Sequence, residues 1–365
     1  MRTIRAMLGF PLLINQGNPM ASSPRAVALI LSGFLLAACG GGGGGGGTGS
    51  TPIDASGPQS VAITETNAKP VAANALDAAQ NTSATRGANG VPVGVQVDSG
   101  TAATQLEWIA QAARFAASSF SAGQLPVGVS VNQTVNCRLG GTMAISGNVS
   151  SASGLSQGDS FTITTSNCGL VAGTTTMVMS GQMQVTIASG FIGTTLPFHV
   201  VMQTTATNLT VTSGGITVVA NGDSRLDWSA TSASSQTLAA TGARMTNAET
   251  ISGLSHTTTM RNYSQSITIN GASLTGSLQA TVETTSSRIG ATPVQYTIST
   301  PTPVTWNSGT RAATGGVIKV MGAANSQLLL TINSDGTATI QIDANGDGTF
   351  EKTITTNTAE LAGLL

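Results

Sequence analysis

The sequence predicts a mostly β protein: an antiparallel β-meander forming a curved sheet, half-barrel or barrel, with one N-terminal amphipathic helix packed on it. Three observations support this fold class. Apolar and polar residues alternate in many short segments from Val127 onward, which is the period of a half-buried strand. Turn sequences such as Asn270-Gly271 and Asp335-Gly336 separate these segments. Only 8% of the residues are charged and 4% are aromatic, so hydroxyl groups are expected to solvate the outer faces.

Glycine recurs at apolar-face positions in three of the expected strands, at Gly147, Gly181 and Gly276. A glycine that points inward lets a strand bend, and repeated bends curl a sheet. We therefore expect the sheet to be curved rather than flat.

Two helices and one strand are expected before the main run of strands. Residues 70–80 predict a short helix, with Pro70 at its first position. Residues 91–97 alternate as an edge strand, and residues 102–120 carry an apolar stripe at helical spacing. This stripe is formed by Leu106, Ile109, Ala113, Ala116 and Phe120. The helix at 102–120 is the one expected to pack on the sheet.

The N-terminal region has the pattern of an export signal. Arg25 precedes the apolar segment 26–38, which is too short to span a bilayer and has the length of a secretory signal core. A start at Met20 makes this signal compact, so we expect translation to begin there.

The apolar segment ends in the tetrapeptide Leu36–Cys39, which resembles the lipobox of bacterial lipoproteins. The resemblance implies a diacylglycerol on the Cys39 thiol, cleavage just before Cys39, and residues 1–38 as the signal peptide. Gly40 does not provide the aspartate-type cue for retention in the inner membrane, so the resemblance implies a lipid anchor in the outer membrane of a Gram-negative envelope. Two or three acyl chains, at about 0.8 kcal/mol per buried methylene, make such anchoring effectively permanent.

The composition divides the remaining chain into three parts. Residues 39–69 contain the lipidated cysteine and a Gly/Ser-rich stretch, which predicts a flexible tether. Residues 70–90 are expected to be a partly ordered linker. Residues 91–365 are expected to form a single β-rich domain.

Charge and aromatic content argue against two classes of protein. Fourteen Lys and Arg side chains stand against 15 Asp and Glu, and removal of residues 1–38 takes away only basic ones. A mildly acidic mature chain is a poor partner for nucleic acid. A membrane pore is disfavoured because so few aromatic residues cannot build girdles at both interfaces.

The three cysteines of the chain are expected to have two different roles. If Cys39 carries the lipid, Cys137 and Cys168 are left as a pair in an oxidising compartment, which predicts a disulfide. A redox or metal site at these thiols is the alternative. It is disfavoured because they lie far apart in sequence and neither His199 nor His256 flanks them.

One string of oxygen donors resembles the first half of an EF-hand-type calcium loop. Asp343, Asn345 and Asp347 occupy alternate positions, but Ile354 stands where a bidentate glutamate is needed and no helix is expected beside the loop. We therefore favour a hairpin turn, in which the glycines after Asn345 and Asp347 supply positive φ. Weak Ca²⁺ binding is the alternative, and no other cofactor is expected.

A serine motif is also present, but in the wrong context for catalysis. Residues 154–158 have the Gly-x-Ser-x-Gly spelling around Ser156. A nucleophile elbow needs a strand before the serine and a helix after it, whereas here a serine-rich turn precedes a strand at Phe161. His199 and His256 are both expected at the surface. We therefore expect no enzyme, with a serine hydrolase as a remote alternative.

The expected function is that of an outer-membrane-anchored lipoprotein with a non-enzymatic structural or partner-binding role. Its partners would be the membrane, through the lipid, and an envelope protein. The alternative is a periplasmic carrier of an apolar acyl ligand, by architectural analogy with half-barrel lipoprotein carriers. In that case the helix at 102–120 would close the sheet over an adaptable surface of Met177, Met179 and Met183. A packed interior would favour partner binding, and a cavity beneath the helix would favour the carrier.

Overall fold

The structure is a computed structural model, and it describes twelve stretches of the chain. These are residues 57–81, 129–137, 139–150, 154–172, 175–193, 195–213, 216–232, 234–251, 254–286, 288–290, 293–307 and 312–364. All of them belong to one compact unit, residues 55–365. The signal peptide, the lipobox, the strand expected at 91–97 and the helix expected at 102–120 lie outside the described residues.

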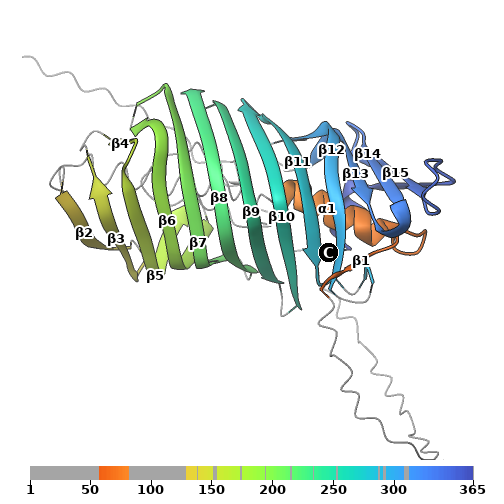
Figure 1. Cartoon of the computed structure of the whole chain (residues 1–365), viewed down its shortest axis with the longest axis horizontal. Coiled ribbons are helices and arrows are strands. Elements are labelled where there is room, and N and C mark those ends of the chain that lie inside the picture. Colours follow the sequence, from red (N-terminus) through yellow and green to blue (C-terminus); the bar gives the residue numbers. More distant parts are fainter. Residues whose placement is uncertain are drawn as a thin grey trace, which may run out of the picture. The chain divides into compact units, whose positions relative to one another are not determined.

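The described chain is built mainly from strands, which pair into one 16-stranded sheet (Figure 1). The strands are β1 (Gln59–Ser60), β2 (Val129–Asn136), β3 (Thr142–Val149), β4 (Gly154–Ser156), β5 (Ser160–Ala172), β6 (Thr175–Gly193), β7 (Phe198–Ser213), β8 (Ile216–Ser232), β9 (Ser235–Ile251), β10 (Leu254–Asn270), β11 (Ser273–Thr284), β12 (Val294–Asn307), β13 (Ala313–Met321), β14 (Gln327–Ile332), β15 (Thr337–Asp343) and β16 (Lys352–Asn357). The helices are α1 (Ala68–Asn81), the 3₁₀ helix η1 (Ala323–Asn325) and α3 (Thr358–Ala362).

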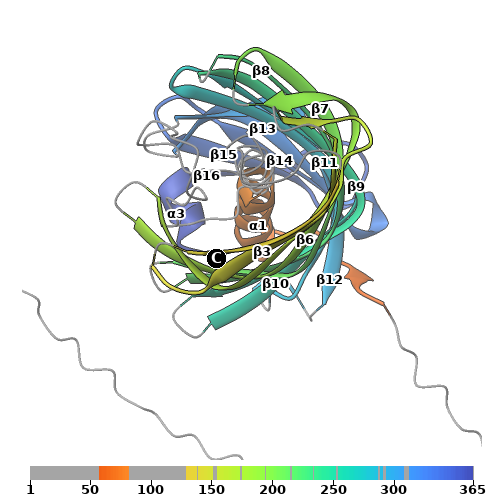
Figure 2. The ribbon, with the colours of Figure 1, turned by 90° about the vertical axis from the view of Figure 1, so that its left-hand side faces the viewer.

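Strands that follow one another in the chain are almost always neighbours in the sheet. The order runs from β16 down to β5 and then to β3 and β2, with β4 on β6 and β1 parallel to β12. Because the consecutive pairs are antiparallel and joined by short connections, the meander predicted from sequence is confirmed. The described strands form an open, curved sheet whose path ends at β2 and β16 (Figures 1 and 2).

The three inward glycines act in two different ways. Gly147 and Gly181 adopt φ values of 153° and 115°, and a Cβ on Gly181 would lie 2.2 Å from the carbonyl oxygen of Asn208. The ladder between β6 and β7 shifts register beside Gly181, so this glycine marks a bend. Gly276 instead leaves space for the ring of Trp306, which a Cβ would approach to 2.7 Å.

Helix α1 lies inside the curve of the sheet (Figure 2). It contacts β11, β13, β14, β15 and α3. Eight apolar side chains spread around the helix are at most 5% exposed, and six of them are alanine, which lets the surrounding backbone approach closely. They are Ala68, Val71, Ala72, Ala73, Ala75, Leu76, Ala78 and Ala79. The helix expected at residues 70–80 is therefore confirmed, with slightly wider bounds.

The start of the folded body differs from the predicted boundary at residue 91. Residues 57–81, which the composition places in the tether and the linker, belong to the compact unit. β1 pairs in parallel with β12, and Val61 and Ile63, which follow β1 in the chain, are buried. The difference arises because an alanine-rich segment resembles a flexible spacer in composition. In the structure, the same small side chains allow the sheet to enclose the helix.

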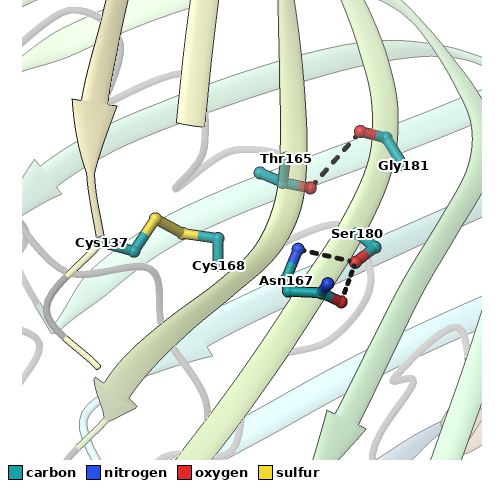
Figure 3. The surroundings of a disulfide bond; sticks show 6 residues. All are labelled: Cys137, Thr165, Asn167, Cys168, Ser180 and Gly181. Carbon is teal, nitrogen blue, oxygen red and sulfur yellow. Dashed lines mark hydrogen bonds between the residues drawn. A yellow bond between two sulfur atoms is a disulfide. The ribbon is translucent and has the colours of Figure 1, made fainter. Parts of the chain in front are cut away.

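The predicted disulfide between Cys137 and Cys168 is confirmed (Figure 3). It joins the end of β2 to β5, two strands that flank β3, with a Cα–Cα distance of 5.3 Å. Cys168 follows a bulge in β5 where Asn167 has φ 46°, and the Ser180 hydroxyl accepts a hydrogen bond from the Asn167 amide at 2.9 Å. The crosslink therefore stabilises the β2 end of the described sheet. Among the described helices, none has the length and apolarity needed to cross a membrane.

Candidate functional site

The inner face of the sheet carries a group of buried polar side chains where it meets α1. Asn74 and Asp77 lie one turn apart on α1 and are 2% and 5% exposed. The hydroxyl of Tyr296, on β12, donates a hydrogen bond to the side-chain oxygen of Asn74. Burial raises the pKa of Tyr296 well above its usual value, and the negative charge of Asp77 raises it further. The phenol is therefore neutral and serves as a donor.

Asp77 also approaches two residues of neighbouring strands. Glu249 on β9 and His256 on β10 face each other in the ladder, with His256 Nε2 3.6 Å from Glu249 Oε2. One side-chain ligand atom from each of Asp77, Glu249 and His256 lies within 4.8 Å of the other two. Glu249 is buried, and the His256 side chain is 23% exposed, so His256, which was expected at the surface, is half-buried on the inner face.

Two threonine hydroxyls continue this polar row. Thr258 lies two residues beyond His256 on the same face of β10, and it pairs with Thr284 on β11. The Oγ1 atoms of Thr258 and Thr284 are buried and have no hydrogen-bond partner within the part of the chain that the structure describes. Thr284 is only 1% exposed.

Sequence reasoning missed this group because its members come from distant segments. One local pattern could have revealed it. Glu249 lies four residues after Met245 on β9, so both side chains point to the inner face of the sheet. A carboxylate at a core-facing strand position is unusual and calls for a partner.

The loop predicted to be either a turn or a calcium site connects β15 to β16. Ile342 pairs with Lys352 across it, and Gly346 and Gly348 have φ values of 76° and 89°. The Asp343 carboxylate, which is fully buried, accepts hydrogen bonds from both glycine amides, at 2.7 and 2.9 Å. The turn interpretation is therefore confirmed.

The ligand set of this loop differs in part from the predicted one. Oxygens of Asp343, Asp347 and Glu351 lie within 4.8 Å of one another. Asn345 instead uses its oxygen to accept the Asp347 amide at 2.8 Å. A hydrogen bond from the Thr349 amide, more than any other contact, lowers the pKa of Asp347. Calcium binding by this loop stays a prediction.

The serine motif does not gather the groups of a catalytic triad. The Ser156 hydroxyl lies 2.8 Å from that of Ser150, and its backbone amide donates to Asp159 at 2.7 Å. Ser156 pairs with Phe191, which in turn pairs with His199. Two strand spacings, about 9.5 Å at roughly 4.8 Å each, therefore separate Ser156 from His199.

Each of the two histidines lies close to a carboxylate on a neighbouring strand, and neither lies beside Ser156. His199 is exposed, as expected, and lies 2.9 Å from an oxygen of Asp227 on the outer face of the sheet. His256 faces Glu249 on the inner face.

Comparison with protein-family models, curated proteins and solved structures found no match.

Proposed function

We propose that the chain is an outer-membrane-anchored lipoprotein whose folded body has a non-enzymatic structural or partner-binding role. The tetrapeptide Leu36–Cys39 and the apolar segment before it support the anchor. The Cys137–Cys168 disulfide supports export, since disulfides persist in oxidising compartments such as the bacterial periplasm.

The observation that carries the role of the body is the packing around α1. Its apolar side chains are buried on several sides by β11, β13, β14, β15 and α3. This part of the concave face is therefore filled by the protein's own helix. Such packing favours a body that meets its partners through its outer surface.

The outer face of the central strands supports contact through polar groups. Along each strand, exposed side chains with hydroxyl, amide or charged groups alternate with buried ones that point to the inner face. Exposed examples on β7 and β8 are Gln203, Thr205, Thr207, Asp223, Arg225 and Asp227. A face of this kind suits hydrogen bonding to a partner or to water rather than burial of a large apolar surface.

The carrier alternative is supported by the methionines of β6. Met177, Met179 and Met183 all face inward and are at most 2% exposed. Their flexible side chains suit an apolar ligand. Native mass spectrometry of the protein from its own host, after removal of the anchor, separates the two functions. A co-purifying mass of lipid size favours the carrier, and a protein subunit favours partner binding.

Metabolic labelling with palmitate tests the anchor. The wild-type chain should incorporate the label, and Cys39→Ser should not. The double variant Cys137→Ser/Cys168→Ser is the matched control, because it removes the two disulfide-bonded cysteines but leaves Cys39. Equal labelling of wild type and Cys39→Ser would overturn the proposal.

A further inference from the structure

We propose that Asp77, Glu249 and His256 form a site for a divalent transition-metal ion, with Zn²⁺ as the representative, that fastens α1 to the sheet. The site is independent of the lipid anchor. It lies between the helix and strands β9 and β10, far from the β15–β16 loop in sequence.

The donor set fits this class of metal. Two carboxylate oxygens and one imidazole nitrogen are standard zinc ligands, bound at about 2.0–2.2 Å. The three ligand atoms already lie within 4.8 Å of one another, and His256 Nε2 and Glu249 Oε2 are 3.6 Å apart. Ca²⁺ and Mg²⁺ prefer shells made of oxygen alone, so the imidazole favours a transition metal.

The cluster gathers negative charge in a buried place. Asp77 and Glu249 are 5% and 8% exposed, so both carboxylates have lost most of their water. Two negative charges so close together repel each other, and the repulsion is stronger where water is excluded. A divalent ion would balance both charges, and an imidazole nitrogen of His256 would join the carboxylate oxygens as a ligand.

A second observation also indicates a polar occupant. Thr284, 1% exposed, has a buried hydroxyl without a partner among the described residues, and Thr258 opposite it has the same property. A buried hydroxyl left without a hydrogen bond is unfavourable, because it has lost its water without gaining a partner. Both threonines share the face of β10 and β11 that continues from His256. A water in the outer shell of the metal would satisfy them.

The ligands join segments that are distant in the chain. Asp77 comes from α1, whereas Glu249 and His256 come from strands about 170 residues later. A shared ion would therefore stabilise the enclosed helix against release, alongside the hydrogen bond between Tyr296 and Asn74.

The test uses the full chain, freed of metal with a chelator, and Zn²⁺ alone as the probe. Isothermal calorimetry should find one Zn²⁺ that depends on His256, and the thermal midpoint should rise when Zn²⁺ is added. His256→Ala should weaken binding by more than the roughly 10- to 100-fold that loss of an outer-shell group costs. His199→Ala is the matched control, because it removes the only other histidine of the chain. Asp343→Ala should also bind Zn²⁺ like wild type, which would show that the ion does not bind at the β15–β16 loop.

A second measurement needs no ligand variant. The chain has two histidines, so the ring signals of His256 can be assigned in NMR spectra by their persistence in His199→Ala. Zn²⁺ should shift the His256 signals and leave those of His199 in place. The proposal is overturned if the folded wild type binds no Zn²⁺, if His256→Ala binds it as tightly as wild type, or if the His256 signals do not respond.

Discussion

The hydroxyl of Tyr296 on β12 donates to the side-chain oxygen of Asn74 on α1, so a buried hydrogen bond joins residues 222 positions apart. Both partners are at most 2% exposed. This contact holds a polar side chain of a helix whose buried apolar side chains are mostly alanine.

Tyr296→Phe should lower the free energy of unfolding by about 1–3 kcal/mol, because the Asn74 amide oxygen would be left buried without its donor. Urea denaturation measures this. Tyr296→Phe combined with Asn74→Leu should cost less than the sum of the two single variants, since each single change already removes the same bond. Additive costs would show that the two side chains are not coupled.

Removing the disulfide with Cys137→Ser/Cys168→Ser should destabilise the body by about 3–4 kcal/mol, as expected for a closed loop of about 30 residues. The measurement is chemical denaturation without reductant. Cys39→Ser, which leaves the disulfide in place, is the control and should unfold like wild type. A double variant as stable as wild type would mean that the crosslink contributes nothing to the folded state.

Gly181→Ala should be far more damaging than Gly158→Ala. Both glycines have positive φ, at 115° and 93°. A Cβ on Gly181 would collide with the backbone of Asn208, whereas one on Gly158 would meet nothing within 4 Å. We expect about 1 kcal/mol for Gly158→Ala and more than about 3 kcal/mol for Gly181→Ala. Similar thermal midpoints for the two variants would contradict the role of Gly181 as a bend.

Asp343→Ala should destabilise the β15–β16 connection by about 1–3 kcal/mol, because the amides of Gly346 and Gly348 would lose their acceptor. Asn345→Ala, at an exposed position, should cost less. Calorimetry with Ca²⁺ tests the ion separately. Heat that appears with wild type and vanishes with Asp343→Ala supports calcium binding, and no heat with wild type leaves the loop as a turn alone.

The contact between α1 and α3 should make stability depend on acid pH. The Lys69 ammonium lies 2.6 Å from Glu360, and together with the Thr356 hydroxyl it lowers the pKa of that carboxyl. A depressed folded-state pKa means that this contribution is present above the unfolded value of 4.5 and is lost as the pH falls through the folded value.

Thermal midpoints measured from pH 7 down to pH 3 should therefore fall less steeply in Glu360→Gln than in wild type. Because Glu360 is exposed, the difference should shrink in high salt. Glu351→Gln is the control at another exposed carboxylate. If the thermal midpoints of wild type and Glu360→Gln fell equally steeply at acid pH, Glu360 would not contribute to the pH dependence of stability.

The sheet could be predicted from sequence because its signals are local. A period of two in segments such as Met177–Ile187 indicates a strand that is buried on one side, and Asn270-Gly271 indicates the turn between β10 and β11. The ends of the strands were less predictable. β6 extends from Thr175 to Gly193 because ladder pairing with β5 and β7 continues through residues whose own alternation is weak.

The sequence alone determined the meander, the glycines at which strands bend and the cysteine pair, since each depends on residue type, on spacing or on the number of cysteines. Only the tertiary structure decided that the alanine-rich segment 68–81 is enclosed by the sheet, that Gly276 makes room for Trp306, and that Asp77 meets Glu249 and His256. Some of these contacts join segments that are far apart in the chain: α1 and β15 are separated by more than 250 residues. Which surfaces meet at such separations follows from the way the whole sheet curls, and no local pattern encodes it.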